Sequence, residues 1–218
     1  MRILCLSDIH GEAAGLSEVL TEASECDLII IAGDVTHLGG AAEAQTILAP
    51  ILARGIPVFA VAGNMDRDGV RQYLGEQGID LHGRGVIRGA IGIMGLGGCN
   101  HSPFGTPWEL SDEEATGCLA AGFEQIRDAA FKVLVSHAPP RDSKIDRSFT
   151  RMHVGSQPVR DFLLTAKVDL CLCGHIHEAW GEDRVGETHC VNIGPYKDGR
   201  YARVTIDEGQ ASVIWRKK

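Results

Sequence analysis

The chain has 218 residues, of which 44% are hydrophobic, and a formal net charge of −8. This length and apolar content predict one folded domain over residues 1–218 and exclude a disordered chain. The negative charge argues against a long nucleic acid or an anionic membrane as a partner. The longest apolar runs have about six residues, whereas a membrane-spanning helix needs roughly 20. No signal-peptide pattern is present, so we expect a cytoplasmic protein.

The seven cysteines lie mostly within apolar stretches, at positions 5, 26, 99, 118, 171, 173 and 190. We expect free thiols that pack as small apolar side chains in a reducing compartment. No CxxC pair suggests a zinc ribbon or a redox motif. Cys171 and Cys173 are two residues apart in a predicted strand, so both should face the same side and serve packing.

Five short, almost fully apolar runs organise the chain, and such runs are typical of parallel strands that are buried on both faces. They cover residues 3–7, 28–33, 58–63, 132–136 and 170–174. Apolar residues recur at helical spacing over 16–23 and 44–52, between the first three runs. This alternation of strand and helix predicts an α/β fold with a mainly parallel sheet and right-handed crossovers.

The other segments predict a short helix over 67–76 and short strands in the glycine-rich stretch 83–98. Ser111 and Glu114 match a capping box, which predicts a helix from 112 to about 128. A loop over 138–155 follows, and loops of about 18 residues in compact domains are usually functional or disordered. Ser156 should cap a helix that ends near 167. The tail predicts strands over 185–194, 201–206 and 211–215, the last two joined by a hairpin turn.

Each of the five apolar runs ends on residues of the types that bind metal ions. These residues are Asp8, His10, Asp34, Asn64, His137, His175 and His177. Because the carboxyl ends of parallel strands meet at one edge of a sheet, we expect these side chains to converge in one crevice. Carboxylate, imidazole and amide groups suit Mn²⁺, Fe²⁺, Co²⁺, Ni²⁺ or Zn²⁺. The set is large enough for two ions.

The motifs that carry these residues are DIH (8–10), GD (33–34), GNMD (63–66), SH (136–137) and GHIH (174–177). In this order they resemble the calcineurin-like metallophosphoesterase family. The resemblance implies an α/β sandwich of two mixed β-sheets flanked by α-helices. It also implies a dinuclear metal site at the carboxyl ends of the strands.

The resemblance further assigns a role to each ligand. Asp8, His10 and His177 would hold one divalent ion. Asn64, His137 and His175 would hold the second, and Asp34 would bridge the two. Manganese is favoured among the possible ions, and a water or hydroxide that bridges them would attack phosphorus. Asn64 could also contact a substrate phosphate through its amide nitrogen.

The chain departs from the family pattern at Met65, where relatives commonly have His in the sequence GNH followed by an acid. That His is usually assigned to protonating the leaving oxygen. A subset of small microbial relatives also lacks it and is associated with phosphodiesterase activity. Asp66 is retained, and we expect it to cap the following helix.

We hypothesise that another histidine supplies the missing acid, His153 ahead of His101, because both lie in loops that follow strand exits. The alternative needs no acid, if the substrate has a good leaving group or metal ions stabilise the leaving oxygen. The remaining histidines, at positions 37, 82 and 189, are expected on the surface. Arginines at 141, 147 and 151 either recognise phosphate or belong to a solvated loop.

These features predict a metal-dependent phosphohydrolase, in particular a phosphodiesterase that acts on small phosphate esters. The alternatives are a phosphomonoesterase or nucleotide hydrolase, and a non-catalytic scaffold with the same fold. A scaffold would be expected to have lost ligands, whereas all seven are present here. We expect a small phosphate ester as partner and neither long nucleic acid nor membrane; the sequence predicts no oligomeric state.

Overall fold

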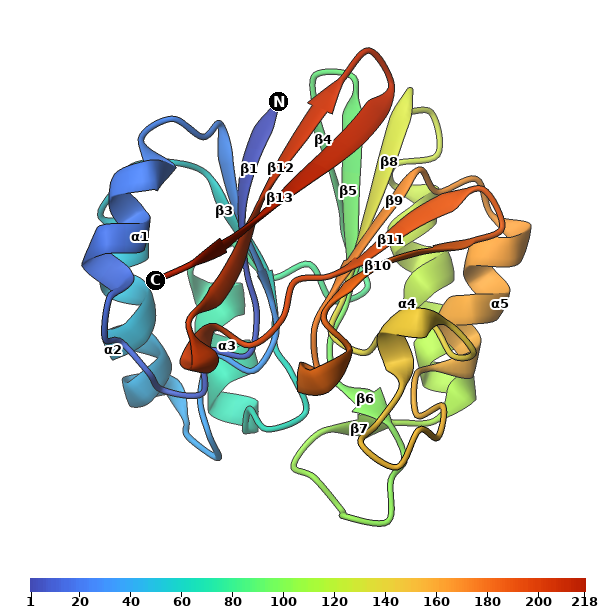
Figure 1. The fold of residues 1–218 in the computed structure, drawn as a ribbon, viewed down its shortest axis with the longest axis horizontal. Helices are drawn as coiled ribbons and strands as arrows, with labels where there is room; N and C mark the ends of the chain where they lie inside the picture. Colours follow the sequence, from blue (N-terminus) through green and yellow to red (C-terminus); the bar gives the residue numbers. More distant parts are fainter.

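The computed structural model describes residues 1–218 and places two β-sheets face to face, with helices on the outer side of each (Figure 1). The first sheet has the order β13-β12-β1-β2-β3. Its strands are β1 (Arg2–Leu6), β2 (Leu28–Ala32), β3 (Val58–Val61), β12 (Arg200–Asp207) and β13 (Gln210–Lys217). Strands β1, β2 and β3 are parallel to one another, and β12 pairs with β1 in the antiparallel direction. On its outer side lie α1 (Leu16–Ala23), α2 (Ala41–Leu52) and α3 (Asp68–Glu76).

The second sheet has the order β10-β11-β9-β8-β5-β4. Its strands are β4 (Gly85–Arg88), β5 (Ile91–Leu96), β8 (Phe131–Ser136), β9 (Leu170–Cys173), β10 (Gly181–Val185) and β11 (Thr188–Asn192). The four inner strands are parallel and both edge strands are antiparallel. On its outer side lie α4 (Asp112–Glu124) and α5 (Gln157–Thr165). A ribbon of β6 (Cys99–Asn100) and β7 (Glu109–Leu110) lies below this sheet in Figure 1.

Apolar side chains pack on both faces of the sheets, which explains why the central strands appear in the sequence as continuous apolar runs. In β2, Ile30 and Ala32 belong to the core between the sheets, whereas Ile29 and Ile31 belong to the core under the helices. Because successive side chains of a strand point to opposite faces, a strand covered on both sides must be apolar throughout. The predicted sandwich of two mixed sheets flanked by helices is therefore confirmed.

The strands and helices predicted from periodicity are present, and the differences lie at ends and edges. The helix expected over 112–128 ends at Glu124. The strand β10 was not predicted, because this edge strand has the partly exposed, polar sequence GEDRV and no apolar alternation. All seven cysteines are free, and Cys171 and Cys173 are buried under the helices as expected. No helix is long and apolar enough to cross a membrane.

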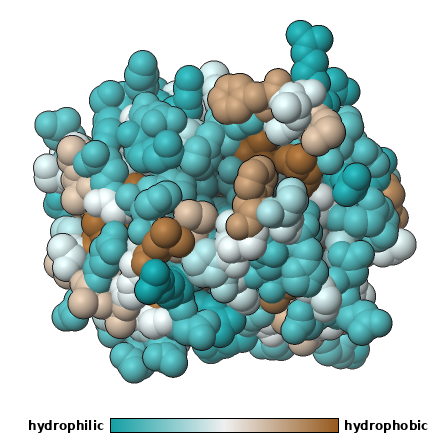
Figure 2. Space-filling view, turned by 90° about the horizontal axis from the view of Figure 1, so that it is seen from below, coloured by the Kyte–Doolittle hydropathy of each residue, from teal (hydrophilic) through white to brown (hydrophobic).

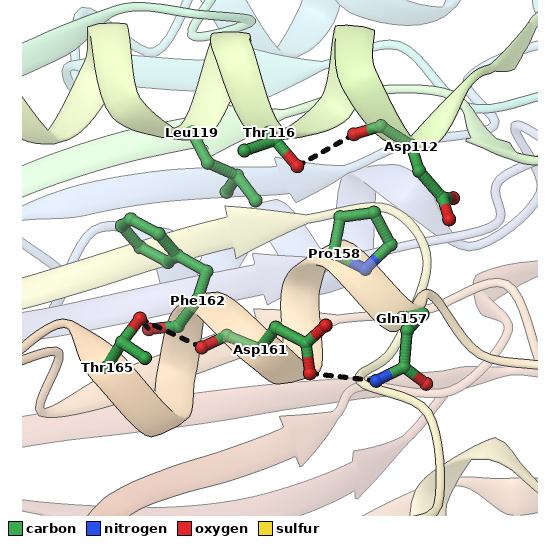
Figure 3. Close-up of a pocket in the computed structure, with 8 residues that line it drawn as sticks. All are labelled: Asp112, Thr116, Leu119, Gln157, Pro158, Asp161, Phe162 and Thr165. Atoms are coloured by element: carbon green, nitrogen blue, oxygen red, sulfur yellow. Dashed lines mark hydrogen bonds between the residues drawn. The ribbon is translucent and has the colours of Figure 1, made fainter.

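The helices α4 and α5 pack against each other on the outer side of the second sheet. The ring centroids of Phe123 and Phe162 are 5.6 Å apart. A hollow of about 260 Å³ lies beside this contact (Figure 3). Its polar groups satisfy one another, since the Gln157 amide donates to Asp161 at 2.8 Å. This hollow is a feature of helix packing, and it contains none of the candidate metal ligands.

The capping box of α4 provides a test of local helix stability. The N–H of Glu114 donates to Ser111 Oγ at 3.2 Å, and the N–H of Ser111 donates to Glu114 Oε2 at 2.8 Å. We expect Ser111→Ala to lower the free energy of unfolding by about 1 kcal/mol in urea denaturation. Ser17→Ala is the control, because Ser17 is an exposed residue of α1 whose change should stay within about 0.5 kcal/mol. Equal effects of the two substitutions would contradict the assigned cap.

Candidate metal centre

The seven candidate ligands all follow the carboxyl ends of strands, at the edge where the two sheets meet. Asp8 and His10 follow β1, and Asp34 and Asn64 follow β2 and β3. On the second sheet, His137 follows β8, and His175 and His177 follow β9. Figure 2 shows this side of the molecule, which is hollowed near the middle. The two sheets therefore contribute ligands from opposite sides of one depression.

The backbone at four of these positions adopts a conformation that side chains rarely allow. The φ angles are 51° at Asp8, 50° at His10, 49° at Asp34 and 69° at His175. Positive φ costs free energy for residues other than glycine and persists where the surrounding structure holds it in place. All four positions lie in turns directly after the strands β1, β2 and β9.

Glycines make room for the ligands that approach them. A Cβ atom on Gly63 would collide with the carboxylate of Asp34, and one on Gly174 would collide with Ser7 and Asp8. A Cβ atom on Gly33 would collide with the ring of His137. The glycine in each of the motifs GD, GN and GH is thus required by the close approach of a side chain from another strand.

A first group joins Asp8, His10 and His177. Asp8 Oδ1 lies 3.3 Å from His177 Nε2 and 4.0 Å from His10 Nε2, and the two Nε2 atoms are 3.3 Å apart. One ligand atom of each residue lies within 4.8 Å of the others. Such spacing leaves the three atoms able to contact one cation.

A second group joins Asp34, His137 and Asn64. His137 Nε2 lies 2.9 Å from Asn64 Oδ1 and 3.5 Å from Asp34 Oδ2. The ring of His175 lies beside the ring of His137, with ring centroids 4.9 Å apart. Asp8 also lies close to this group, because ligand atoms of Asp8, Asp34 and His137 are within 4.8 Å of one another.

Asp34 lies between the two groups. Its Oδ2 atom is 3.5 Å from His10 Nε2 and 3.5 Å from His137 Nε2. Its Oδ1 atom accepts the N–H of Met65 at 2.8 Å, which fixes the plane of the carboxylate. One oxygen of Asp34 therefore faces histidines from both sheets, as a shared ligand must.

The buried charges favour a cation at this point. Burial opposes ionisation of Asp8, but its hydrogen bond with His177 and the nearby His137 hold the pKa well below its usual range. Burial would lower the pKa of His137, but the Asp34 carboxylate raises it to about 9. Burial and the charge of His137 lower the pKa of His175 to about 4. Two ionised carboxylates thus lie at the centre of the histidines.

Asp66 does not cap the following helix, so that expectation was wrong. Its buried carboxylate accepts the backbone N–H groups of Val35 at 3.1 Å, Thr36 at 2.8 Å and Gly63 at 2.9 Å. These donors belong to the loops after β2 and β3, which would otherwise have buried N–H groups without partners. Asp66 therefore joins the two loops that carry Asp34 and Asn64. No local sequence pattern marks this role, because Val35 and Thr36 lie 31 and 30 residues from Asp66 in the chain.

A cavity of about 600 Å³ adjoins the metal-ligand cluster and reaches Asn64 and His175. Both histidines proposed as acids line it. His101 is paired with Glu109 at 3.3 Å and is 70% exposed. His153 Nδ1 is 2.6 Å from Asp146 Oδ1, and the Asp146 side chain is fully buried. Sequence reasoning missed Asp146, which precedes His153 by seven residues and gives no periodic signal.

The three remaining histidines have different environments. His37 is exposed, and its Nδ1 lies 3.4 Å from His10 Nδ1. His189 pairs with Glu182 at 2.8 Å near the surface. The expectation of a solvated surface position holds only in part for His82, which is half-buried and packs edge-on against Trp108 with ring centroids 4.8 Å apart. Burial and the charge of Arg71 lower the pKa of His82 to about 4.

Known proteins share both the sequence pattern and the fold. The sequence profile described as calcineurin-like phosphoesterase matches residues 1–179. The uncharacterised protein MJ1162 of Methanocaldococcus jannaschii is 32% identical over 200 residues, which cover 89% of this chain and 88% of that protein.

Two solved structures illustrate the fold at low sequence identity. A dimetal phosphatase from Danio rerio has a TM-score of 0.74 at 13% identity, with 100% of this chain and 96% of that chain covered. An archaeal phosphodiesterase has a TM-score of 0.57 at 13% identity, with 99% and 100% covered. At such identities the likeness concerns the fold alone, whereas the profile and MJ1162 carry the family. The chain belongs to the calcineurin-like phosphoesterase family.

Proposed function

We propose that this protein is a metal-dependent phosphodiesterase that hydrolyses small phosphate esters. The observation that carries the proposal is the position of Asp34 Oδ2, 3.5 Å from a histidine of each ligand group. A carboxylate oxygen shared in this way is the arrangement that two neighbouring cations need. All seven ligand residues are present, which argues against a scaffold that has lost its metal site.

In this proposal Asp8, His10 and His177 would hold one divalent ion. Asn64, His137 and His175 would hold the other, and Asp34 would be shared between the two groups. The oxygen and nitrogen donors fit first-row ions, and we favour Mn²⁺. When bound, two such ions provide a nucleophile at neutral pH and neutralise charge on the phosphate oxygens.

Two features support a diester rather than a monoester as the substrate. Met65 occupies the position where relatives commonly have a histidine that is assigned to protonating the leaving oxygen, and small relatives without that histidine are associated with phosphodiesterase activity. The cavity beside the cluster has room for a large ester group next to the phosphate.

His153 is our proposed general acid for the leaving oxygen. Its Nδ1 is held by the buried Asp146, which leaves Nε2 as the nitrogen able to exchange a proton at the cavity. Asp146 is itself fixed by the N–H groups of Asp142, Ser143 and Gly155, each at 3.1 Å. A buried carboxylate partner holds the imidazole in one tautomer and one orientation, which a general acid needs. His101 is paired with Glu109 at the longer distance of 3.3 Å and is 70% exposed, so it is held less firmly.

We also propose that the protein acts in the cytoplasm, without long nucleic acids or membranes as partners. Seven free cysteines and no disulfide suit a reducing compartment. The net charge of −8 disfavours polyanionic partners.

The first test is hydrolysis by metal-stripped protein to which Mn²⁺, Ni²⁺, Zn²⁺ or Mg²⁺ is added singly. We expect cleavage of bis-p-nitrophenyl phosphate to exceed that of p-nitrophenyl phosphate and to require a metal. Asp34→Asn should lower kcat/KM at least about 100-fold, because the carboxylate shared by both groups is lost. The exposed Asp207→Asn is the matched control and should retain the wild-type rate. Absence of turnover with every ion, despite two bound ions per chain, would favour the scaffold alternative.

Gly174 provides a test of the metal site that requires no substrate. A methyl group there would displace Asp8, so Gly174→Ala should weaken Mn²⁺ binding roughly 10- to 100-fold in calorimetry. Gly117→Ala is the control, because Gly117 lies in α4 with open space around it. That substitution should leave Mn²⁺ binding unchanged and stabilise the fold by about 0.5–1 kcal/mol. Equal Mn²⁺ affinity in both variants would exclude Asp8 as a ligand.

The role of His153 is tested through the leaving group. For His153→Ala we expect the loss in rate to be about 100-fold larger with methyl phenyl phosphate than with methyl p-nitrophenyl phosphate, because p-nitrophenolate leaves without a proton. His101→Ala is the control and should show no such difference. A loss for His153→Ala that is the same for both leaving groups would indicate a structural role.

A further inference from the structure

The cavity beside the metal-ligand cluster has a mainly apolar wall. Two segments form most of it: residues 99–106, which comprise β6 and the loop that follows it, and residues 148–154, within the long segment after β8. Phe104 of the first loop is 87% exposed, and Phe149 and Met152 of the second are 88% and 63% exposed. Figure 2 shows apolar side chains gathered beside the hollow on this face. Large apolar side chains that gather in the open beside a cavity mark a binding site.

The loop that carries Phe104 is held in place by Glu109. The Glu109 carboxylate accepts the N–H groups of Ser102 at 3.3 Å and Thr106 at 2.9 Å, and both hydroxyl groups as well. The N–H of Phe104 donates to Ser102 Oγ at 3.3 Å. The ring of Phe104 is therefore exposed from an ordered loop.

The loop that carries Phe149 is fixed in a similar way. The N–H of Phe149 donates to Glu178 Oε1 at 2.6 Å, and Glu178 follows the metal-ligand candidate His177 directly. The N–H of Ser148 donates to the carbonyl of Met152 at 3.0 Å, which closes the tip of the loop. Phe149 is thus tied to the segment that carries the proposed metal ligands.

One charged group on the cavity wall has no partner within the protein. Arg141 lines the cavity, and its guanidinium group makes no ion pair and no hydrogen bond to another residue. A free guanidinium binds phosphate oxygens or stacks on a flat ring.

We propose that this cleft binds a nucleoside: a flat aromatic ring with polar edge atoms, esterified to the phosphate that reaches the metal centre. The inference rests on the proposed function, because it assumes a phosphate ester at the cluster. Phe104 and Phe149 offer ring faces for stacking, and the free guanidinium of Arg141 can stack on a flat ring or bind the phosphate. An alkyl chain offers no π face to these groups, so they favour a nucleobase over a lipid tail.

The proposed nucleoside site is tested by measuring binding affinity instead of hydrolysis. Calorimetry on the Mn²⁺-loaded protein would compare adenosine 5′-methylphosphonate, octyl methylphosphonate and methyl methylphosphonate, which differ only in the esterified alcohol. We expect the adenosine ester to bind at least about tenfold more tightly than either of the others. Equal or tighter binding of the octyl ester would overturn the proposal in favour of an acyl chain. Equal binding of the adenosine and methyl esters, or no binding of any, would overturn it as well.

Two variants test whether the rings of Phe104 and Phe149 account for the tighter binding of the adenosine ester. Phe104→Ala and Phe149→Ala should each weaken the adenosine ester about tenfold relative to the methyl ester, as is typical when one stacking ring is removed. Because both rings are largely exposed, these variants should fold normally. Leu164→Ala, a half-exposed apolar residue of α5, is the control.

The two proposals fail in distinguishable ways. Hydrolysis of diesters with no preference for the adenosine ester would overturn the cleft and leave the phosphodiesterase in place. Binding of the adenosine ester that depends on both rings, with no hydrolysis in the presence of any ion, would refute the proposed phosphodiesterase activity. The proposed nucleoside site would then remain.

Discussion

The buried carboxylate of Asp34 is the contact on which the rest of the centre depends. It faces His10, which follows β1 of the first sheet, and His137, which follows β8 of the second, at the same distance. The backbone of Met65 holds its other oxygen, and Asp66 joins the loops after β2 and β3. An ionised carboxylate in an apolar interior is costly unless charged or hydrogen-bonding partners surround it. The two sheets supply those partners together, so neither sheet alone forms the site.

This arrangement places strain where the chemistry occurs. Four of the seven candidate ligands have left-handed backbone conformations, and three glycines allow side chains to approach more closely than a Cβ atom would permit. Such conformations persist because the strands below them are buried on both faces and cannot shift. The apolar layers therefore hold the ligands in position as well as stabilising the fold.

In the proposed function, the metal centre and the substrate cleft come from different parts of the fold. The candidate metal ligands lie on turns directly after strands, whereas the cavity wall comes from the two longer loops that carry Phe104 and Phe149. Strand ends are rigid, and loops can vary without loss of the core. The replacement of a common histidine by Met65 fits this division, since the proposed acid His153 is held by a loop around Asp146. The acid and the substrate cleft would then share one segment of the chain.

The sequence by itself determined the local elements and the set of candidate ligands. Burial on both faces makes a strand such as β2 apolar throughout, and the capping box at Ser111 depends on neighbours three residues apart, so both can be read locally. Tertiary structure decided the rest: the packing of His82 against Trp108, the role of Asp66 and the pairing of His153 with Asp146. It also placed Phe104 and Phe149 on one cavity. These contacts join residues without a common period, and only packing of the two sheets brings them together.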